Sequence, residues 1–449
     1  MSFAFFRPLV ASAALIAASP VALSQSLDQI IDRYESFDRA GDPEQTAKAN
    51  NEDARSWHIV SPGYIRDRAR SASQMLAALD ALGYTTEGPE VPILRHLLTA
   101  HIDAHAYDTA RIPFTGDWGF FAAPVFTAMR TRLTTRAQAE AWTDRLDDLP
   151  RYFDQQTENM RRGIATGWTQ HGDPLNTSIA QIRAQIVEDP ADSTLFLPFE
   201  SLSASDLNET EILLLKNKGR TAVADAIEAY RDLLEFMETE YAPAARSAPG
   251  LVSMEGGREA YAVAVAFHTA GAGYSPEEIH QLGQSEVARI RAEMDAIIEE
   301  LAFEGTFEEF IAFLRTGPQF YAETPEQLLE KASEMSKRLD AILPRYFKTL
   351  PRLPYGVAAV PAAIAPGYTT GRYSGGDAEK GIAGTYLVNT YALDQRPLYE
   401  LPALSAHEAV PGHHLQIALA QELQDVPDFR KSYYATAFGE GWGLYAEKL

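Results

Sequence analysis

Most of the chain repeats its apolar residues with the spacing of an amphipathic helix. Between residues 205–242, apolar and charged side chains alternate with this period. Helix starts follow at 275–278 (SPEE) and 324–327 (TPEQ), where a capping hydroxyl precedes a proline at the first helical position. An apolar stripe runs from the first start to Leu301, and the second pattern reaches about Tyr346. With 449 residues, 46% of them hydrophobic, the sequence predicts a mainly α protein with a large core.

One region departs from this pattern and predicts a small β-sheet. From 350 to 397 the chain is rich in Pro, Gly, Val and Tyr, with β-like runs at 355–360 and 384–390. Arg372 and Tyr373 lie between these runs in an irregular TGRYSGG loop, where they are candidates to contact a substrate. An edge strand of such a sheet could hold an extended peptide by backbone hydrogen bonds. The alternative is a hairpin on the surface.

The charge and the N-terminus limit the partners and the location. Lys and Arg number 39 against 62 Asp and Glu, and the net charge of −23 argues against nucleic acid and anionic membranes as partners. Residues 1–24 combine one Arg, a short apolar run and small residues before a cleavage point after Ser24. They predict a signal peptide, and hence a secreted or periplasmic protein without stable membrane insertion. The chain has no Cys, which excludes disulfides and thiol chemistry.

A cluster of histidines beside a glutamate predicts a metal site. The segment 407–416, HEAVPGHHLQ, begins as a zinc-protease helix does, but the HExxH pattern needs its second His at position 411, which holds a proline. On a straight helix neither His413 nor His414 could share a metal with His407. The Pro-Gly dipeptide at 411–412 would interrupt the helix. If these two residues loop out, His413 returns beside His407.

Two later glutamates could complete such a site, since catalytic zinc commonly takes two His and one Glu. Glu440 follows His413 at a separation that allows the motif helix to end and another helix to run back alongside. Glu447 would lie on the same helical face two turns on, where a carboxylate could orient a ligand histidine. Glu408, next to His407, would take the proton from a metal-activated water.

Other patterns favour structure over chemistry. His101 and His105 have a spacing that could clasp a metal on a helix, but no glutamate follows His101, and a structural or cleft-lining pair is favoured. The chain lacks G-x-S-x-G, S-x-x-K and phosphate-loop patterns. Four aromatic residues near the histidine motif are expected in the core: Tyr433, Tyr434, Trp442 and Tyr445.

The most specific pattern in the chain is HEAVPGHHLQ followed by EGWGLYAE at 440–447. It continues upstream through AGTYLVNT, VAAVPAAIAPGY and GGREAYAVAVAFHTAGAGYSPEE, and more faintly through RIPFTGDWGFF and GIATGWTQ, so it covers most of the chain after the signal. By these motifs the chain resembles the DUF885 family of bacterial proteins. That family is grouped with the gluzincin metallopeptidases, whose relatives include the thimet oligopeptidase, Taq carboxypeptidase and angiotensin-converting enzyme types.

The resemblance implies a large helical bowl or clamshell with a deep cleft and a small sheet next to the active-site helix. Residues 25–248 would form part of the cleft, and residues 249–449 would form the catalytic region. One Zn²⁺ per chain would be bound by the three ligands His407, His413 and Glu440, with Glu408 as the base. His414 is the alternative second histidine.

The implied function is zinc-dependent cleavage of amide bonds in short peptides, by an oligopeptidase or carboxypeptidase. Two alternatives stay open: a zinc amidohydrolase of modified or non-ribosomal peptides, and a catalytically dead helical binding protein. His414 and Tyr373 are candidates for the oxyanion donor. Because the sequence ends at Leu449, within the expected helix of Glu440, the catalytic region is expected to be truncated and weakly active or inactive. The sequence leaves the oligomeric state open.

Overall fold

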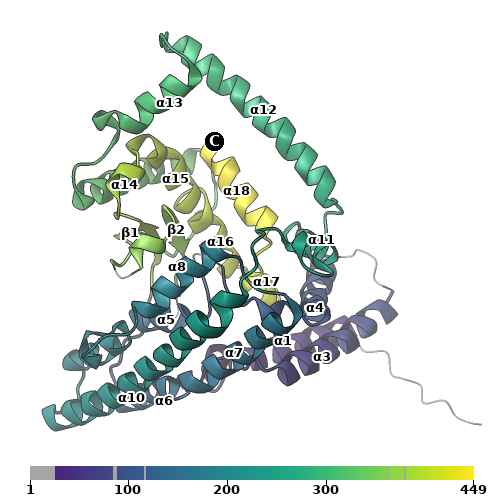
Figure 1. Ribbon diagram of the computed structural model, residues 1–449, viewed down its shortest axis with the longest axis vertical. Coiled ribbons are helices and arrows are strands. Elements are labelled where there is room, and N and C mark those ends of the chain that lie inside the picture. The colour runs from purple at the N-terminus through teal and green to yellow at the C-terminus, as the bar shows by residue number, and fades with distance from the viewer. Residues whose placement is uncertain (1–25, 84–87, 116–117, 363, 379–380) are drawn as a thin grey trace, which may run out of the picture.

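The computed structural model describes residues 26–83, 88–115, 118–362, 364–378 and 381–449. Within these residues the protein is mainly α-helical with one small sheet, which confirms the predicted fold class (Figure 1). The predicted signal peptide lies outside the described residues. None of the described helices combines the length and the apolarity that crossing a bilayer requires.

The largest core lies among helices of the N-terminal half. Its longest helix, α10, spans Glu209–Phe236 and begins at a capping box formed by Asn208, so the helical pattern predicted for 205–242 is confirmed. Aromatic rings fill this core: Phe153 and Tyr230 have ring centroids 5.0 Å apart. The helices that α10 contacts are α6 (Arg136–Asp147), α7 (Leu149–Thr166), α8 (Gly172–Arg183) and the short α9 (Leu197–Glu200).

A second core joins the N-terminal helices to the C-terminal part of the chain. It is built by α1 (Leu27–Gly41), α3 (Pro62–Ala81) and α4 (Glu90–Ala106). Phe429, on α17 (Asp428–Ser432), packs edge-on against Tyr34 at 5.7 Å between ring centroids. Arg430, the next residue, forms an ion pair with Glu90 at the start of α4. The N-terminal helices therefore fix the position of α17 and of the chain that follows it. The remaining helices of this half are α2 (Pro43–Ala49) and α5 (Ala123–Arg130).

The middle of the chain leaves the body as an arch of two helices (Figure 1). α12 (Pro276–Glu300) starts at the predicted capping box and follows α11 (Gly257–His268), and α13 (Phe307–Thr316) follows it. None of the described residues of α12 is buried. The helix prediction is confirmed, but the apolar stripe is exposed: Leu282, Val287, Ile290, Met294, Ile297 and Leu301.

The sheet has three strands in the order β1-β3-β2. β1 (Tyr355–Ala359) pairs parallel with β3 (Gly384–Val388), and β2 (Gly371–Ser374) pairs antiparallel with β3. β1 and β3 were both predicted. β2 was predicted as an irregular loop, which is wrong, because a strand of four residues that begins with a glycine and is followed by two more carries little strand signal. The sheet packs against α14 (Pro325–Ile342) through β1 and against α15 (Leu401–Glu408) through β2, and these two helices also contact each other.

The chain ends in a group of helices beside the sheet. α16 (His413–Gln421) follows α15 after a short break, and α18 (Thr436–Lys448) contacts both of them. Figure 1 shows α18 between the sheet region and the arch of α12 and α13. These helices carry every residue of the predicted metal site.

Candidate metal centre

Between α15 and α16 the backbone makes a detour of two residues. The Gly412 N–H donates to the Ala406 carbonyl oxygen at 2.9 Å. In a continuous helix that carbonyl would accept from position 410. The hydrogen-bond ladder therefore resumes two residues late, as the loop-out predicted at 411–412 requires.

Two contacts hold this detour in place. A Cβ at Gly412 would lie 1.9 Å from the His407 carbonyl oxygen, so only glycine fits there. The indole N–H of Trp442, on α18, donates to the Pro411 carbonyl oxygen at 2.7 Å. The break is thus fixed by its own sequence and by the neighbouring helix.

His407 is held against α18 by a small residue and a carboxylate. A Cβ at Gly443 would lie 2.5 Å from Cε1 of the imidazole, so the ring occupies the space that this glycine leaves. Nδ1 of His407 lies 2.7 Å from Oε1 of Glu447, one turn further along α18. An acceptor at Nδ1 favours the tautomer protonated there and leaves Nε2 free to bind a metal.

Three side chains from three helices converge at this point. The ligand atoms of His407, His413 and Glu440 all lie within 4.8 Å of one another. Oε2 of Glu440 is 3.4 Å from Nε2 of His407 and 3.8 Å from Nε2 of His413. Around a tetrahedral zinc ion, with ligand distances of about 2.0–2.2 Å, neighbouring ligand atoms lie about 3.3–3.6 Å apart. The donor set and its spacing therefore fit zinc after small movements.

The environment of His413 favours the form that binds metals. Burial lowers its pKa, and the neighbouring His407 lowers it further. A neutral imidazole offers a lone pair, so less proton competition opposes metal binding. No other group of three His, Cys, Asp or Glu residues meets the same criterion in the described part of the chain.

His414 occupies a different environment. Its Nδ1 lies 2.9 Å from the Tyr373 hydroxyl, and its ring centroid lies 4.6 Å from that of Tyr355. Burial lowers the pKa of His414 to about 4. The structure thus brings His413, and not His414, to the cluster. His414 and Tyr373 are buried and contact each other, and Tyr373 also lines the cavity beside the cluster, so their role as oxyanion donor stays a prediction.

Glu408 is buried beside the cluster and is held by the sheet. The main-chain N–H of Tyr373, in β2, donates to its Oε2 at 2.6 Å. Burial raises the pKa of Glu408, and the Tyr373 N–H and His407 oppose part of this rise. A carboxylate with a raised pKa next to a metal site is suited to accept and return a proton.

A cavity of about 420 Å³ opens over these groups. Arg372 lines it, and its guanidinium carbon lies 5.4 Å from the ring centroid of Tyr368; contact with a substrate stays a prediction for this residue. The cavity is bounded by the edge of β2 and the adjoining chain, the two motif helices and the start of α18: Thr369, Gly371, Arg372, Tyr373, His407, Glu408, His413, Ile417, Tyr434 and Glu440.

Tyr434 is a site residue that the sequence reasoning missed. It was expected in the core, but it is 39% exposed and lines the cavity. Its hydroxyl donates to Oε1 of Glu440 at 2.9 Å. Tyr445 is also exposed, so the core prediction is wrong for both residues. The position of Tyr434, six residues before Glu440 and just before a helix, was the signal available in the sequence.

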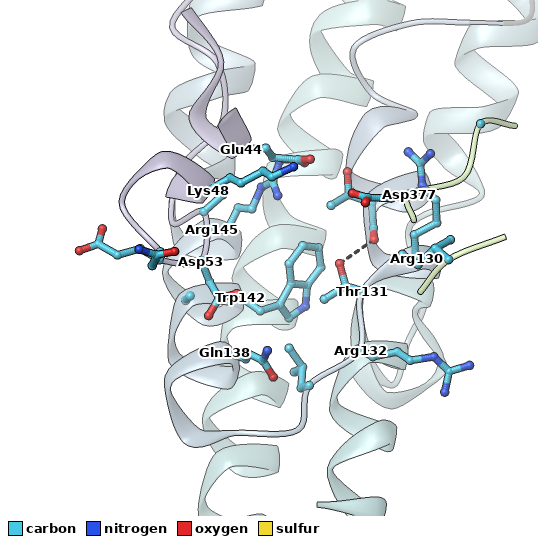
Figure 2. A pocket seen from close by; sticks show the side chains of 18 residues that line it. Glu44, Lys48, Asp53, Arg130, Thr131, Arg132, Gln138, Trp142, Arg145 and Asp377 are labelled. Carbon is cyan, nitrogen blue, oxygen red and sulfur yellow. Dashed lines mark hydrogen bonds and ion pairs between the residues drawn. The ribbon is translucent and has the colours of Figure 1, made fainter. Parts of the chain in front are cut away.

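A second cavity, of about 590 Å³, lies between the N-terminal helices and the residues that follow β2 (Figure 2). Its wall carries charges of both signs; Arg145 pairs with Glu44 at 2.8 Å and stacks over the ring of Trp57. In Figure 2 the Trp142 side chain lies between the charged groups of the two walls. No histidine is among the described residues that line this cavity. We therefore place the candidate chemistry at the cavity over His407 and Glu408.

Comparisons with known proteins agree with this fold. A family model described as "Bacterial protein of unknown function (DUF885)" matches residues 11–449. A protein of known structure from Colwellia psychrerythraea, described as a "putative lipoprotein", superimposes with a TM-score of 0.81 at 20% sequence identity. The match covers 94% of this chain and 77% of the Colwellia chain. At this identity the likeness concerns the fold alone. No curated protein matches the chain.

Proposed function

The chain belongs to the bacterial DUF885 family, and we propose that it is an exported zinc hydrolase that cleaves amide bonds of short peptides. One observation carries the proposal: the ligand atoms of His407, His413 and Glu440 converge next to a buried Glu408. The likeness of the motifs to gluzincin oligopeptidases and carboxypeptidases supports it. The segment 1–24 supports export, to the periplasm or outside the cell.

Each residue of the site has a role in this proposal. His407 and His413 would hold one zinc ion per chain through Nε2, and Glu440 would hold it through Oε2. The chemistry that a bound zinc ion supplies is Lewis acidity, which polarises a carbonyl and lowers the pKa of a bound water towards about 7. Glu447 would accept a hydrogen bond from Nδ1 of His407 and so fix the orientation of the ring.

Glu408 would act as the general base. It takes a proton from the attacking water and later gives it to the leaving amine. Its carboxylate has one oxygen tied to the Tyr373 N–H, and this contact fixes its orientation at the floor of the cavity. The Tyr373 hydroxyl contacts His414, so His414 would position Glu408 indirectly, through the residue whose N–H binds the carboxylate.

The edge of β2 is suited to bind the peptide backbone. The Asn389 N–H donates to the Thr370 carbonyl oxygen, so the main-chain groups of Thr370 point to β3. Because this direction alternates along an antiparallel strand, the main-chain N–H and C=O of Arg372 also point to β3. Gly371 and Tyr373 then direct their main-chain groups to the other edge, which lines the cavity. The Tyr373 N–H agrees with this, because it donates to Glu408. An extended peptide pairing with Gly371 would thus pass directly over the proposed base.

The test is hydrolysis of a library of dipeptides and longer peptides by the full-length protein. We expect cleavage that stops when a chelator removes zinc and returns when zinc is restored. Cleavage of modified amides alone would replace the peptidase by an amidohydrolase. If the purified protein binds no zinc, the proposal of a zinc hydrolase fails. The remaining alternative is then a catalytically dead helical binding protein.

A further inference from the structure

The two oxygens of Glu440 have different partners. Oε1 accepts a hydrogen bond from the Tyr434 hydroxyl, with 2.9 Å between the two oxygens. Oε2 lies 3.4 Å from Nε2 of His407 and 3.8 Å from Nε2 of His413. A carboxylate with one oxygen bound to a phenol presents the other oxygen in a fixed direction. The Tyr434 hydroxyl therefore occupies one oxygen of Glu440 and leaves the other to face the two histidines.

A glycine in the first turn of α18 makes this contact feasible. Tyr434 precedes the helix, and its side chain passes over the first turn to reach Glu440. A Cβ at Gly439 would lie 2.1 Å from Cζ of the Tyr434 ring. At Gly441, by contrast, a Cβ would meet nothing within 4 Å in the described structure. The absence of a side chain at position 439 thus makes room for the Tyr434 ring, whereas a side chain at position 441 would not disturb it.

Glu440 depends on such a partner because little else restrains it. Its side chain is 51% exposed, and an exposed glutamate populates several rotamers. Restricting it to one rotamer on metal binding costs conformational entropy. Tyr434 is itself exposed, so the hydrogen bond and the space at Gly439 set its position, and burial in a core does not.

We propose that Tyr434 is a positioning residue of the metal centre: its phenol fixes Glu440 as a one-oxygen ligand, and Gly439 provides the space that the phenol ring occupies. This inference rests on the proposed function, because it presupposes that the cluster binds zinc. It concerns the coordination of Glu440 and assigns Tyr434 no contact with the scissile bond.

The experiment compares the zinc affinity of three variants of the full-length protein: Tyr434→Phe, Gly439→Ala and the matched control Gly441→Ala. Competition with a chelator gives the zinc dissociation constant, and the visible spectrum of the cobalt-loaded protein reports the coordination geometry. We expect Tyr434→Phe and Gly439→Ala each to weaken zinc binding about 10–100-fold and to alter the cobalt spectrum. Gly441→Ala should match the wild type. The double variant Tyr434→Phe/Gly439→Ala should bind no more weakly than the weaker single variant, because both changes remove one contact.

The outcomes separate this inference from the proposed function. Wild-type zinc affinity and cobalt spectrum in Tyr434→Phe would overturn the positioning role and leave the zinc site intact. A wild-type protein that binds no zinc would sink the proposed function, and the inference with it. Thermal unfolding of the metal-free proteins controls for misfolding. If Gly439→Ala does not fold, Tyr434→Phe decides the question alone, because phenylalanine keeps the ring and removes only the hydroxyl.

Discussion

Two pairs of histidines in this protein differ in how well their spacing along the chain predicts a cluster of ligand atoms. The pair with the spacing of a metal-binding helix forms no such cluster with the residues that the structure describes, and the pair without that spacing does. His101 and His105 lie four residues apart on α4, a continuous helix, so the spacing rule places them on one face. His407 and His413 lie further apart and are separated by a helix break. Among the described residues, only the second pair is joined by a third ligand, Glu440.

The difference lies in what surrounds each pair. The ring of His101 packs edge-on against Phe37 at 5.0 Å, and burial, with the nearby Arg68, lowers its pKa to about 4. His105 is exposed. At the other pair, the detour at Gly412 brings the imidazoles to 4.6 Å between ring centroids, and α18 adds the carboxylates. In this protein, spacing along one helix therefore predicts the convergence of possible ligand atoms less well than a backbone break with a second helix alongside.

The largest expected effect separates the two pairs directly. His407→Ala should weaken zinc binding by more than about 100-fold, because it removes a ligand and not merely an outer partner. His101→Ala should leave zinc binding unchanged, since its ring contacts Phe37 and lies outside the cluster. Chelator competition on both variants measures this. Equal losses in the two variants would remove the distinction between the pairs.

The next effect concerns Glu408, the proposed base beside the second pair. Glu408→Gln should lower peptide turnover by about 10²–10⁴-fold while zinc binding is kept, because the amide cannot accept the proton. The measurements are turnover and zinc content on the same preparation. Turnover that persists in this variant would take Glu408 out of its role.

A smaller effect is expected from the carboxylate that orients His407. Glu447→Gln should weaken zinc binding about 10–100-fold, because Nδ1 loses its charged acceptor at 2.7 Å. Asp103→Asn is the matched control, because Asp103 lies on α4 between the two histidines of the first pair. Zinc titrations should show a change in the first variant only; a change in the control would mean that the α4 pair also binds metal.

The last effect belongs to the first pair and concerns stability. The folded pKa of His101 is about 4, below the ordinary value of 6.5, so the unfolded chain binds more protons between these values. The contribution of His101 to the free energy of unfolding is therefore fully present above pH 6.5 and is lost as the pH falls towards 4. The loss should reach about 2 kcal/mol by pH 5. Denaturant unfolding of the wild type and of His101→Phe at pH 7.5 and pH 5 measures it. The variant should lose less stability than the wild type, and equal losses would contradict the assignment.

Local backbone features were predictable from the sequence because they rest on neighbouring residues. The SPEE segment at 275–278 caps α12 as expected, and the Pro-Gly dipeptide at 411–412 breaks the helix as expected. β1 and β3 were found from their apolar residues. Glu440 was placed from its separation from His413 and from the likeness of the motifs, and the structure brings it within reach of both histidines.

Other features depend on tertiary packing, which the sequence pattern does not contain. The spacing in α12 predicts an apolar face, but it does not say what covers that face, and Leu282 and Val287 are exposed. β2 exists because β3 pairs with it, and its four residues carry little signal of their own. The role of Tyr434 follows from the way its ring passes over Gly439, which no periodicity encodes.

The most direct test of the proposed zinc site is anomalous diffraction at the zinc absorption edge, from crystals of the full-length protein grown with zinc. We expect one strong peak per chain, within bonding distance of Nε2 of His407, Nε2 of His413 and Oε2 of Glu440. The absence of a peak among these three atoms, or a peak bound by His414 in place of His413, would contradict the metal centre described above.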